Sequence, residues 1–465
     1  MHLGDLLPVP VEHGAALVNV TRVDIDSRTC QPGSVFFAMP GTATHGQRFI
    51  EDAVAHGAVA VVSSEPVATS VPVVVLPRDQ LHRAMVAASY RVVGGIPSLR
   101  LVGVTGTNGK TSVTHFVSQI CRAVGLPSHA IGTLSHVRTT PSPPDLARIL
   151  SSALTEVTPE GVVAMEVSSH ALDQGRVDGL TFAVGIFTNL SHDHLDYHES
   201  MATYFEAKAL LFEPSRTQRA IVSCDDEWGR LLVTRRPDAL GVSRRDLANV
   251  RIGDTEVSFV WRGHEIHSPV GGSFNVTNIH LASEAVRALG VPESEIVGAL
   301  SSLTPVPGRF EVVSQPADPF TVVVDYAHTD DALRNLLETA RPLARGRVIT
   351  VFGCGGDRDK TKRPLMGAVA GRLSDVIIVT SDNPRSEDPA RIIDDVLRGI
   401  TPDTRRPGGE PPVAMLDRGA AIAHAVALAR PGDLVLLAGK GHEKVQVIGE
   451  RTEPFDDVEI GRAHV

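Results

Sequence analysis

Residues 101–114 read LVGVTGTNGKTSVT, an apolar run followed by a glycine-bearing loop and a helix-like segment. In a strand–loop–helix unit, backbone N–H groups from Gly106 to Lys110 and the positive end of the helix attract phosphate. Lys110 is expected to contact the terminal phosphates, and the Thr111 hydroxyl to bind Mg²⁺. The string is a variant of the P-loop, because the first glycine of GxxxxGKS/T would fall on Val104. A loop that only turns the chain is the alternative, but GKT after a buried strand favours phosphate binding.

The composition is typical of a globular protein with more than one domain. A chain of 465 residues exceeds a single core, and two or three domains are expected. The net charge of −10 argues against a nucleic-acid partner. The four cysteines form no CxxC pair, which argues against structural zinc and suits a reducing cytoplasm. No signal peptide and no apolar segment of ~18 residues is found, so neither export nor membrane insertion is expected.

The order of strands and helices predicts the fold class. Val- and Ile-rich runs without alternation, separated by helical stretches, predict parallel sheets covered on both faces, and therefore an α/β protein. Glycines and prolines at 94–97 and in TPVPGR (304–309) mark two breaks. We therefore expect three domains, at residues 1–96, 97–308 and 309–465.

Two strings after the glycine loop carry further polar groups. The run GVVAME (161–166) ends on Glu166. A carboxylate at the carboxyl end of a parallel strand lies in the ligand crevice and can hold Mg²⁺ beside Thr111. The alternative is a strand-end glutamate that faces solvent. The segment TNLSHDHLDYH (188–198) is rich in histidine, but its spacing matches no zinc site.

Ten short motifs of the sequence together resemble those of a known family. TGTNGKT, EVSSH, NLSHDHLDYH, YFEAKALLF, GSFNVTN, PGRFE, DYAHT, GGDRDKTKRP, DNPR and AGKGHE stand in the order found in the Mur ligases, ATP-dependent amide-forming enzymes of bacterial cell-wall synthesis. The resemblance runs from about Asp26 to Asp457. It implies an N-terminal UDP-sugar-binding α/β domain, a central P-loop ATPase with a parallel sheet, and a C-terminal Rossmann-like domain for the incoming amino acid. DYAHT and DNPR resemble the branch that adds meso-diaminopimelate to UDP-N-acetylmuramoyl-L-alanyl-D-glutamate through an acyl phosphate.

The resemblance implies a site for ATP and Mg²⁺. Lys208 would be an N-carboxylated lysine that binds a second Mg²⁺ with His194, whereas the residues alone suggest a solvated surface lysine. The implied catalytic residues are Lys110, Glu166, His194 and Lys208. The implied metal ligands are Thr111, Glu166, His194 and Lys208 as its carbamate. The implied ATP-binding residues are Gly106, Thr107, Asn108, Gly109, Lys110, Thr111, Asn275, Asn278, Arg309 and Asp325. Helix capping is the alternative for Asn275.

Two further sets of residues follow from the resemblance. The UDP-sugar would contact Ser27, Thr139, Thr140, Ser168, Gln174 and Arg176. The amino acid would contact Arg358, Asp382, Asn383, Arg385, Gly439 and Glu443. Arg385 can bind the distal carboxylate of diaminopimelate bidentately and would repel the ammonium of lysine. Without the resemblance, an arginine in a proline-bearing loop is read as a solvated surface residue.

The sequence departs from the family pattern in the segments expected to bind the nucleotide sugar. The departures are His45, Gln47, Arg138 and His192, and they leave the identity of the sugar substrate open. The expected partners are small molecules, UDP-MurNAc-dipeptide and diaminopimelate, and the expected state is a cytoplasmic monomer. Two alternatives remain: a paralogous amide ligase that makes a peptide natural product, and a nucleotide-binding regulator without catalysis. The implied catalytic residues are all present, which weighs against the regulator.

Overall fold

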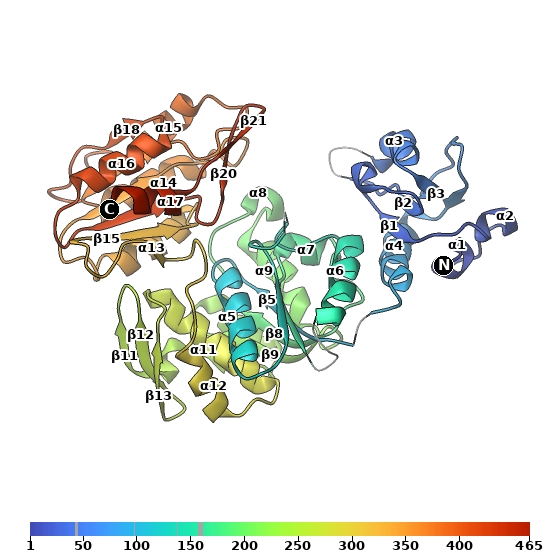
Figure 1. The fold of residues 1–465 in the computed structure, drawn as a ribbon, viewed down its shortest axis with the longest axis horizontal. Helices are drawn as coiled ribbons and strands as arrows, with labels where there is room; N and C mark the ends of the chain where they lie inside the picture. The colour runs from blue at the N-terminus through green and yellow to red at the C-terminus, as the bar shows by residue number, and fades with distance from the viewer. Residues whose placement is uncertain (42–44, 97, 137, 157–160) are drawn as a thin grey trace. The chain divides into compact units, whose positions relative to one another are not determined.

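The computed structural model describes residues 1–41, 45–96, 98–136, 138–156 and 161–465 (Figure 1). The chain divides into two compact units. The first comprises residues 1–103, 126–183 and 213–218, and the second residues 104–125, 184–212 and 219–465. The domain boundaries expected from the sequence stay a prediction, and residue 97 at the first of them lies outside the described residues.

The first unit begins with a four-stranded parallel sheet. Its order is β1-β2-β3-β4, formed by β1 (Arg22–Asp24), β2 (Ser34–Phe37), β3 (Ala58–Ser63) and β4 (Val73–Val75). The helices of this segment are α1 (Leu3–Leu6), α2 (His13–Ala16), α3 (Ile50–Ala55) and α4 (Arg78–Val92). Every residue of β2 is buried, because apolar side chains meet the sheet on both faces. Phe36, Ile50 and Val61 are central to the core.

A six-stranded sheet follows in the order β10-β9-β8-β5-β7-β6. Its strands are β5 (Arg100–Thr105), β6 (Ser128–Ile131), β7 (Val162–Glu166), β8 (Phe182–Phe187), β9 (Thr217–Ser223) and β10 (Leu240–Val242). Its helices are α5 (Lys110–Ala123), α6 (Pro143–Glu156), α7 (Ser169–Asp173), α8 (Leu195–His198), α9 (Met201–Ala209) and α10 (Glu227–Arg235). The predicted strand LRLVGVT is β5, which is buried from its second residue onward.

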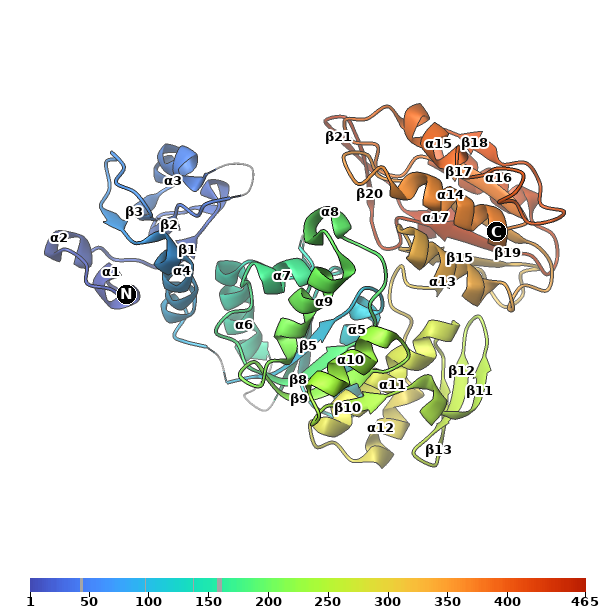
Figure 2. The same ribbon diagram turned by 180° about the vertical axis from the view of Figure 1, so that it is seen from behind.

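A small antiparallel sheet in the second unit contrasts with the parallel ones. It contains β11 (Ala248–Ile252), β12 (Val257–Trp261) and β13 (His264–Ser268), and it lies beside α11 (Ser273–Ala288) and α12 (Glu293–Leu300) (Figure 2). Burial along β12 alternates, as expected for a sheet with one solvated face. This sheet was not predicted from the sequence.

The C-terminal sheet has the order β14-β15-β19-β16-β17-β18, and only β14 is antiparallel to its neighbour. The strands are β14 (Glu311–Val312), β15 (Thr321–Asp325), β16 (Val348–Phe352), β17 (Val376–Thr380), β18 (Val413–Met415) and β19 (Leu434–Ala438). A hairpin of β20 (Val445–Ile448) and β21 (Arg451–Pro454) follows. The helices are α13 (Asp330–Ala340), α14 (Lys362–Leu373), α15 (Pro389–Leu397), α16 (Arg418–Leu428) and α17 (Asp457–His464).

Helices cover both faces of this sheet. Val323 packs with residues of α13, α14 and α15, whereas its neighbours Val322 and Val324 pack with α16 and α17. Successive side chains of a strand point to opposite faces, so a strand buried on both sides reads as an unbroken apolar run. The prediction of parallel sheets covered on both faces is confirmed. Within the described residues, no helix is both long enough and apolar enough to cross a bilayer.

Candidate active site

The glycine loop connects β5 to α5, which begins at Lys110. Gly106 and Gly109 have φ angles of 146° and 85°, in the region that favours glycine. A Cβ on Gly106 would lie 1.9 Å from Thr188 Oγ1, and a Cβ on Gly109 would lie 2.6 Å from Asn278 Oδ1. Both glycines are therefore required by close packing as well as by backbone conformation.

Residues after β8 hold the loop in shape. The Thr107 N–H donates to the Asn189 carbonyl (2.9 Å), and the Asn108 N–H donates to Asn189 Oδ1 (2.9 Å). Asn189 Nδ2 donates back to the Asn108 carbonyl (3.1 Å), and the Ser191 N–H donates to Thr107 Oγ1 (3.0 Å). Asn189 and Ser191 were not among the predicted site residues, although both belong to the string NLSHDHLDYH.

Two lysines meet at the loop. Lys110 Nζ donates to the Gly106 and Thr107 carbonyls (3.0 and 2.8 Å), and Lys208 Nζ donates to the Gly106 carbonyl (2.8 Å). Lys208 is 1% exposed, so the alternative prediction of a solvated surface lysine is wrong. Burial lowers the pKa of Lys208 well below its usual value, and the charge of Lys110 lowers it further, against the opposing charge of Asp193. The protonated form of this side chain is therefore disfavoured.

Tyr204 lies beside both His194 and Lys208. Its ring centroid is 4.4 Å from Lys208 Nζ and 6.1 Å from the centroid of the His194 ring. His194 Nε2 lies 3.4 Å from Asp193 Oδ2. Burial opposes ionisation of Asp193, but the charges of His194, His328 and Lys110 lower its pKa overall. Asp193 was also missed, because its loop offered several acids and no signal to choose among them.

Arg309 lies near the start of α5. Its Nη2 donates to Thr111 Oγ1 (3.3 Å), and its guanidinium carbon lies 4.5 Å from the centroid of the Tyr326 ring. The buried Asp325 carboxylate accepts backbone N–H groups from Phe310 (2.7 Å) and Ala327 (2.8 Å). Burial raises the pKa of Asp325, with Arg309 opposing. In this structure Asp325 fixes the backbone that carries Arg309.

The two predicted adenine-binding asparagines form a buried pair on α11. Asn278 Nδ2 donates to Asn275 Oδ1 (3.1 Å), and Asn275 Nδ2 donates to the Gly271 carbonyl (2.7 Å). The N-cap position of α11 is Gly272, so the capping alternative for Asn275 is wrong. The close approach of Asn278 to Gly109 places this pair beside the phosphate loop.

Glu166 belongs to the first unit. It is 1% exposed, and its carboxylate accepts the Thr133 N–H (2.8 Å) and the Thr133 hydroxyl (3.3 Å). The solvent-facing alternative is therefore wrong. A role for Glu166 in binding Mg²⁺ stays a prediction.

Five of the six residues predicted for the UDP-sugar lie together. Thr140 Oγ1 donates to the Glu166 carbonyl (2.9 Å) and accepts the Ser168 N–H (3.0 Å). Arg176 donates to the Thr140 carbonyl (3.1 Å) and to Gln174 Oε1 (2.7 Å). Thr139 is linked to this group through Thr133, whose hydroxyl lies 3.2 Å from its own.

The sixth residue, Ser27, donates to Asp52 Oδ2 (2.7 Å) in the N-terminal sheet region. Its neighbour Asp26 has a pKa lowered first by the hydrogen bond from Arg28 and also by the charge of Arg138. Arg138, one of the departures from the family pattern, therefore acts on the segment that carries Ser27.

Five of the six residues predicted to bind the amino acid follow the carboxyl ends of β17 and β19. Asn383 Nδ2 donates to Glu443 Oε2 (2.8 Å), and Asn383 Oδ1 accepts Lys440 Nζ (3.2 Å) and the Val447 N–H (3.0 Å). Lys440, with no exposed surface, also pairs with Glu443 (3.3 Å) and lies 3.7 Å from Asp382 Oδ1. The sequence reading missed Lys440, although it stands within AGKGHE. Burial raises the pKa of Asp382.

The two predicted arginines lie on neighbouring loops. Arg385 Nη1 donates to the Gly356 carbonyl (2.7 Å), and the exposed Arg358 donates to the Asp357 carbonyl (3.3 Å). Gly439 continues from β19, and its N–H donates to the Asp325 carbonyl (3.0 Å). This hydrogen bond connects the residues predicted to bind the amino acid to the backbone around Arg309.

The magnesium site implied by the family resemblance stays a prediction. Among the residues that the structure describes, no group of three or more His, Cys, Asp and Glu side chains is arranged to hold a metal ion. Magnesium keeps several waters and is bound through one or two carboxylates together with substrate phosphates, so it needs no such cage. The Thr111 hydroxyl and the His194 imidazole are candidate ligands, and Lys208 would become one only as a carbamate.

Three segments of the chain match Mur ligase families. Residues 19–100 match the Mur ligase family catalytic domain, residues 104–286 the Mur ligase middle domain, and residues 308–441 the Mur ligase glutamate ligase domain. The chain therefore belongs to the Mur ligase family. The resemblance seen in the sequence and the three-domain α/β fold class are confirmed.

Individual relatives give a more specific comparison than the family models. The UDP-N-acetylmuramoyl-L-alanyl-D-glutamate–2,6-diaminopimelate ligase of Synechococcus elongatus is 43% identical, over 97% of this chain and 95% of its own. A solved structure of an enzyme with the same name is 31% identical, covers 100% of this chain and 98% of the other, and has a TM-score of 0.66. The MurF ligase of Thermotoga maritima in complex with ADP shares the fold, with a TM-score of 0.66 at 17% identity over 96% of this chain and 97% of its own.

Proposed function

We propose that the chain is an ATP- and Mg²⁺-dependent ligase that joins meso-2,6-diaminopimelate to UDP-N-acetylmuramoyl-L-alanyl-D-glutamate. The observation that carries the proposal is the pair of opposite charges at the DNPR loop. Arg385 supplies a guanidinium for a distal carboxylate, and Asn383 on the same loop is bonded to Glu443, which can accept a distal ammonium. Diaminopimelate carries both groups at its far end, whereas lysine carries only the ammonium.

The chemistry requires activation of a carboxylate. An amide does not form directly from a carboxylate and an amine, because hydroxide is a poor leaving group. The D-glutamate carboxylate attacks the γ-phosphorus of ATP, ADP leaves, and the acyl phosphate is then attacked by the amine with release of phosphate. Lys110 and Arg309 would stabilise the charge that develops on the transferred phosphoryl group, since both lie at the start of α5.

Lys208 would take part as a carbamate. Its neutral amine would attack CO₂: a C–N bond would form, one C=O π bond would break and one proton would leave, which converts a neutral amine into an anionic carbamate. The lowered pKa of Lys208 supports this step, because an ammonium group has no lone pair for the attack. Magnesium, when bound, would neutralise the phosphates; Thr111, Glu166, His194 and the Lys208 carbamate are the proposed ligands.

We further propose that the enzyme works as a cytoplasmic monomer. Its proposed substrates are small water-soluble molecules. Size-exclusion chromatography with light scattering tests the monomer directly. A stable dimer would contradict this part of the proposal.

A mass-resolved amide-forming assay tests the function. The purified chain receives ATP, Mg²⁺ and UDP-MurNAc-L-Ala-D-Glu, with diaminopimelate, lysine and ornithine in competition. We expect the diaminopimelate product to dominate by about 100-fold, because a charge-assisted contact to the distal carboxylate is lost with the other two. Preference for lysine, or no product with any dipeptide of a UDP-muramoyl panel, would contradict the proposal. Turnover only with an altered sugar would point to the departures at Gln47 and Arg138.

A further inference from the structure

Two loops carry the arginines proposed to contact the amino acid, of which Arg385 is the one proposed to bind the distal carboxylate. Residues 353–361 follow β16 and carry Arg358, and residues 381–388 follow β17 and carry Arg385. Because β16 and β17 are adjacent parallel strands, their carboxyl ends meet at one edge of the sheet. The relative position of the two loops therefore decides the distance between the two guanidinium groups.

Direct hydrogen bonds join the loops. The Gly356 N–H donates to the Asn383 carbonyl (2.9 Å), and Arg385 Nη1 donates to the Gly356 carbonyl (2.7 Å). The Ser386 hydroxyl and N–H donate to the Asp357 carboxylate (2.7 and 3.2 Å). Asp357 and Arg385 both have a φ angle of 52°, which side-chain-bearing residues rarely adopt. Such conformations persist only where surrounding contacts hold them.

Glu387, on the Arg385 loop, holds the strained Asp357 of the other loop. Its Oε1 accepts the Asp357 N–H (2.7 Å) and Arg363 Nη2 (2.9 Å), and its Oε2 accepts Arg363 Nη1 (3.1 Å). Lys360 lies 3.1 Å from the same carboxylate. The hydrogen bonds from Arg363, followed by the N–H of Asp357, lower the pKa of Glu387 to about 2, so the carboxylate is ionised at neutral pH.

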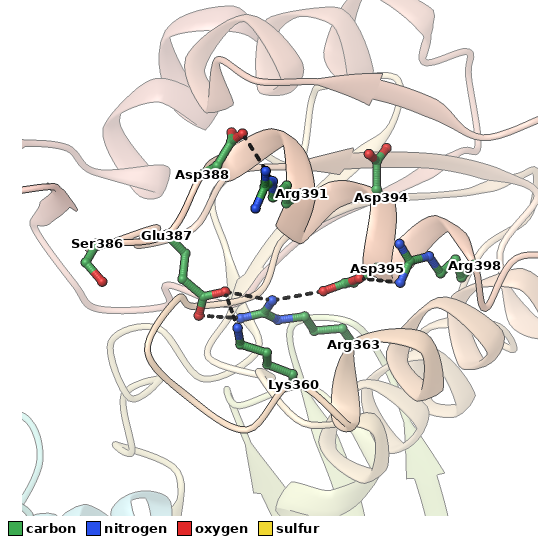
Figure 3. A pocket seen from close by; sticks show the side chains of 9 residues that line it. All are labelled: Lys360, Arg363, Ser386, Glu387, Asp388, Arg391, Asp394, Asp395 and Arg398. Carbon is green, nitrogen blue, oxygen red and sulfur yellow. Dashed lines mark hydrogen bonds and ion pairs between the residues drawn. The ribbon is translucent and has the colours of Figure 1, made fainter.

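Arg363 connects this carboxylate to the body of the domain. It is 1% exposed on α14, and its Nη1 also donates to Asp395 on α15 (3.0 Å). Figure 3 shows Arg363 between Glu387 and Asp395. All three residues line a pocket with a volume of about 560 Å³. Asp394 lines the same pocket, and Figure 3 shows it away from Glu387. The bidentate geometry fixes direction as well as distance.

We propose that Glu387, held by Arg363, is a positioning residue that sets the spacing of the Arg358 and Arg385 loops and so governs recognition of the distal carboxylate. The inference rests on the proposed function. Glu387 contacts no reacting atom in the proposed mechanism. Its loss would leave the two arginine loops joined only by the direct hydrogen bonds of Gly356, Arg385 and Ser386, which weakens a contact that depends on their mutual geometry.

The test is a kinetic comparison of wild type, Glu387→Gln and the milder Ser386→Ala, with Asp394→Asn as the matched control that removes one charge from the same pocket. We expect Glu387→Gln to raise KM for diaminopimelate about tenfold and Ser386→Ala to raise it less, with KM for ATP and for the UDP-dipeptide unchanged. Lysine lacks the distal carboxylate, so kcat/KM for lysine should not change in Glu387→Gln.

The alternative outcomes are distinct. Equal losses for diaminopimelate, lysine and ATP would indicate a merely structural role and overturn the inference, as would an unchanged KM for diaminopimelate in Glu387→Gln or an equal rise in Asp394→Asn. Should Glu387→Gln not fold, an unchanged KM in Ser386→Ala overturns it instead. A wild-type enzyme without diaminopimelate turnover would remove the proposed function and, with it, this inference.

Discussion

Lys208 and Lys440 are both buried lysines, but their surroundings differ in charge. Lys208 Nζ donates to the Gly106 carbonyl (2.8 Å), and burial, followed by the charge of Lys110, lowers the pKa of Lys208. Lys440 Nζ lies 3.3 Å from Glu443 and 3.7 Å from Asp382. A buried ammonium is tolerated when anions compensate for its lost hydration. The neighbouring charges, and not burial alone, make one lysine a reactive amine and the other an ion-pair partner.

The largest effect is expected from Lys208→Ala. If the Lys208 carbamate is required, kcat/KM should fall by at least about 10³-fold. Formate or acetate should restore part of the activity, because a small carboxylate can occupy the space left by the carbamate. Steady-state ligase assays with and without 100 mM-scale carboxylate, roughly the concentration needed for a weak ligand, measure both effects.

A matched control separates the carbamate from general damage at the loop. Lys208→Met fills the space with an apolar chain of similar length, so small carboxylates should rescue it less than Lys208→Ala. An alanine variant with wild-type turnover would show that Lys208 serves only to hold the Gly106 carbonyl. The two buried lysines would then differ in their surroundings but not in a role in the reaction.

A stability measurement addresses the other half of the comparison. Lys440→Met leaves the Glu443 and Asp382 carboxylates without their buried cation, so the free energy of unfolding of the C-terminal region should fall by about 3 kcal/mol. Lys208→Met removes one hydrogen bond from an amine whose protonated form is already disfavoured, and should cost about 1 kcal/mol or less. Thermal melts of both variants at pH 7.5 measure the difference. Equal losses would contradict the distinction.

The sequence was most informative where the site is contiguous. The loop TGTNGKT contains its own glycines, lysine and helix start within a few residues, so both the strand–loop–helix unit and its phosphate-binding character could be predicted. The α/β class was predictable for a similar reason, since a strand buried on both faces has an unmistakable apolar run.

Contacts between distant segments were not visible in the sequence. Lys440 stands 57 residues after Asn383, and Glu166 meets Thr133, which lies 33 residues earlier. Nothing in AGKGHE tells whether its lysine is exposed, because burial depends on what the rest of the chain brings to it. The family resemblance predicted Glu443 and Asn383 as site residues. The contact of Lys440 with both residues, and the position of Asp193 beside His194, could be seen only in the structure.

The last prediction extends the comparison to a third base, which is partly buried. His115 lies on α5 after Lys110, and burial, followed by the charges of Arg309 and Arg122, lowers its pKa to about 4. An unfolded histidine titrates near 6.5, so between pH 6.5 and 4 the unfolded chain binds more protons than the folded one. The stability contributed by neutral His115 is therefore complete above pH 6.5 and is lost as the pH falls toward 4.

His115→Gln should remove this dependence. With allowance for partial exposure, wild type should lose on the order of 2 kcal/mol more than the variant between pH 7 and 4.5. Thermal melts across that range measure the difference in slope, and the same substitution at the exposed His464 is the matched control. Parallel slopes for wild type and His115→Gln would mean that burial and the charges of Arg309 and Arg122 do not keep this ring neutral. Cations at the start of α5 would then disfavour protonation of Lys208 alone.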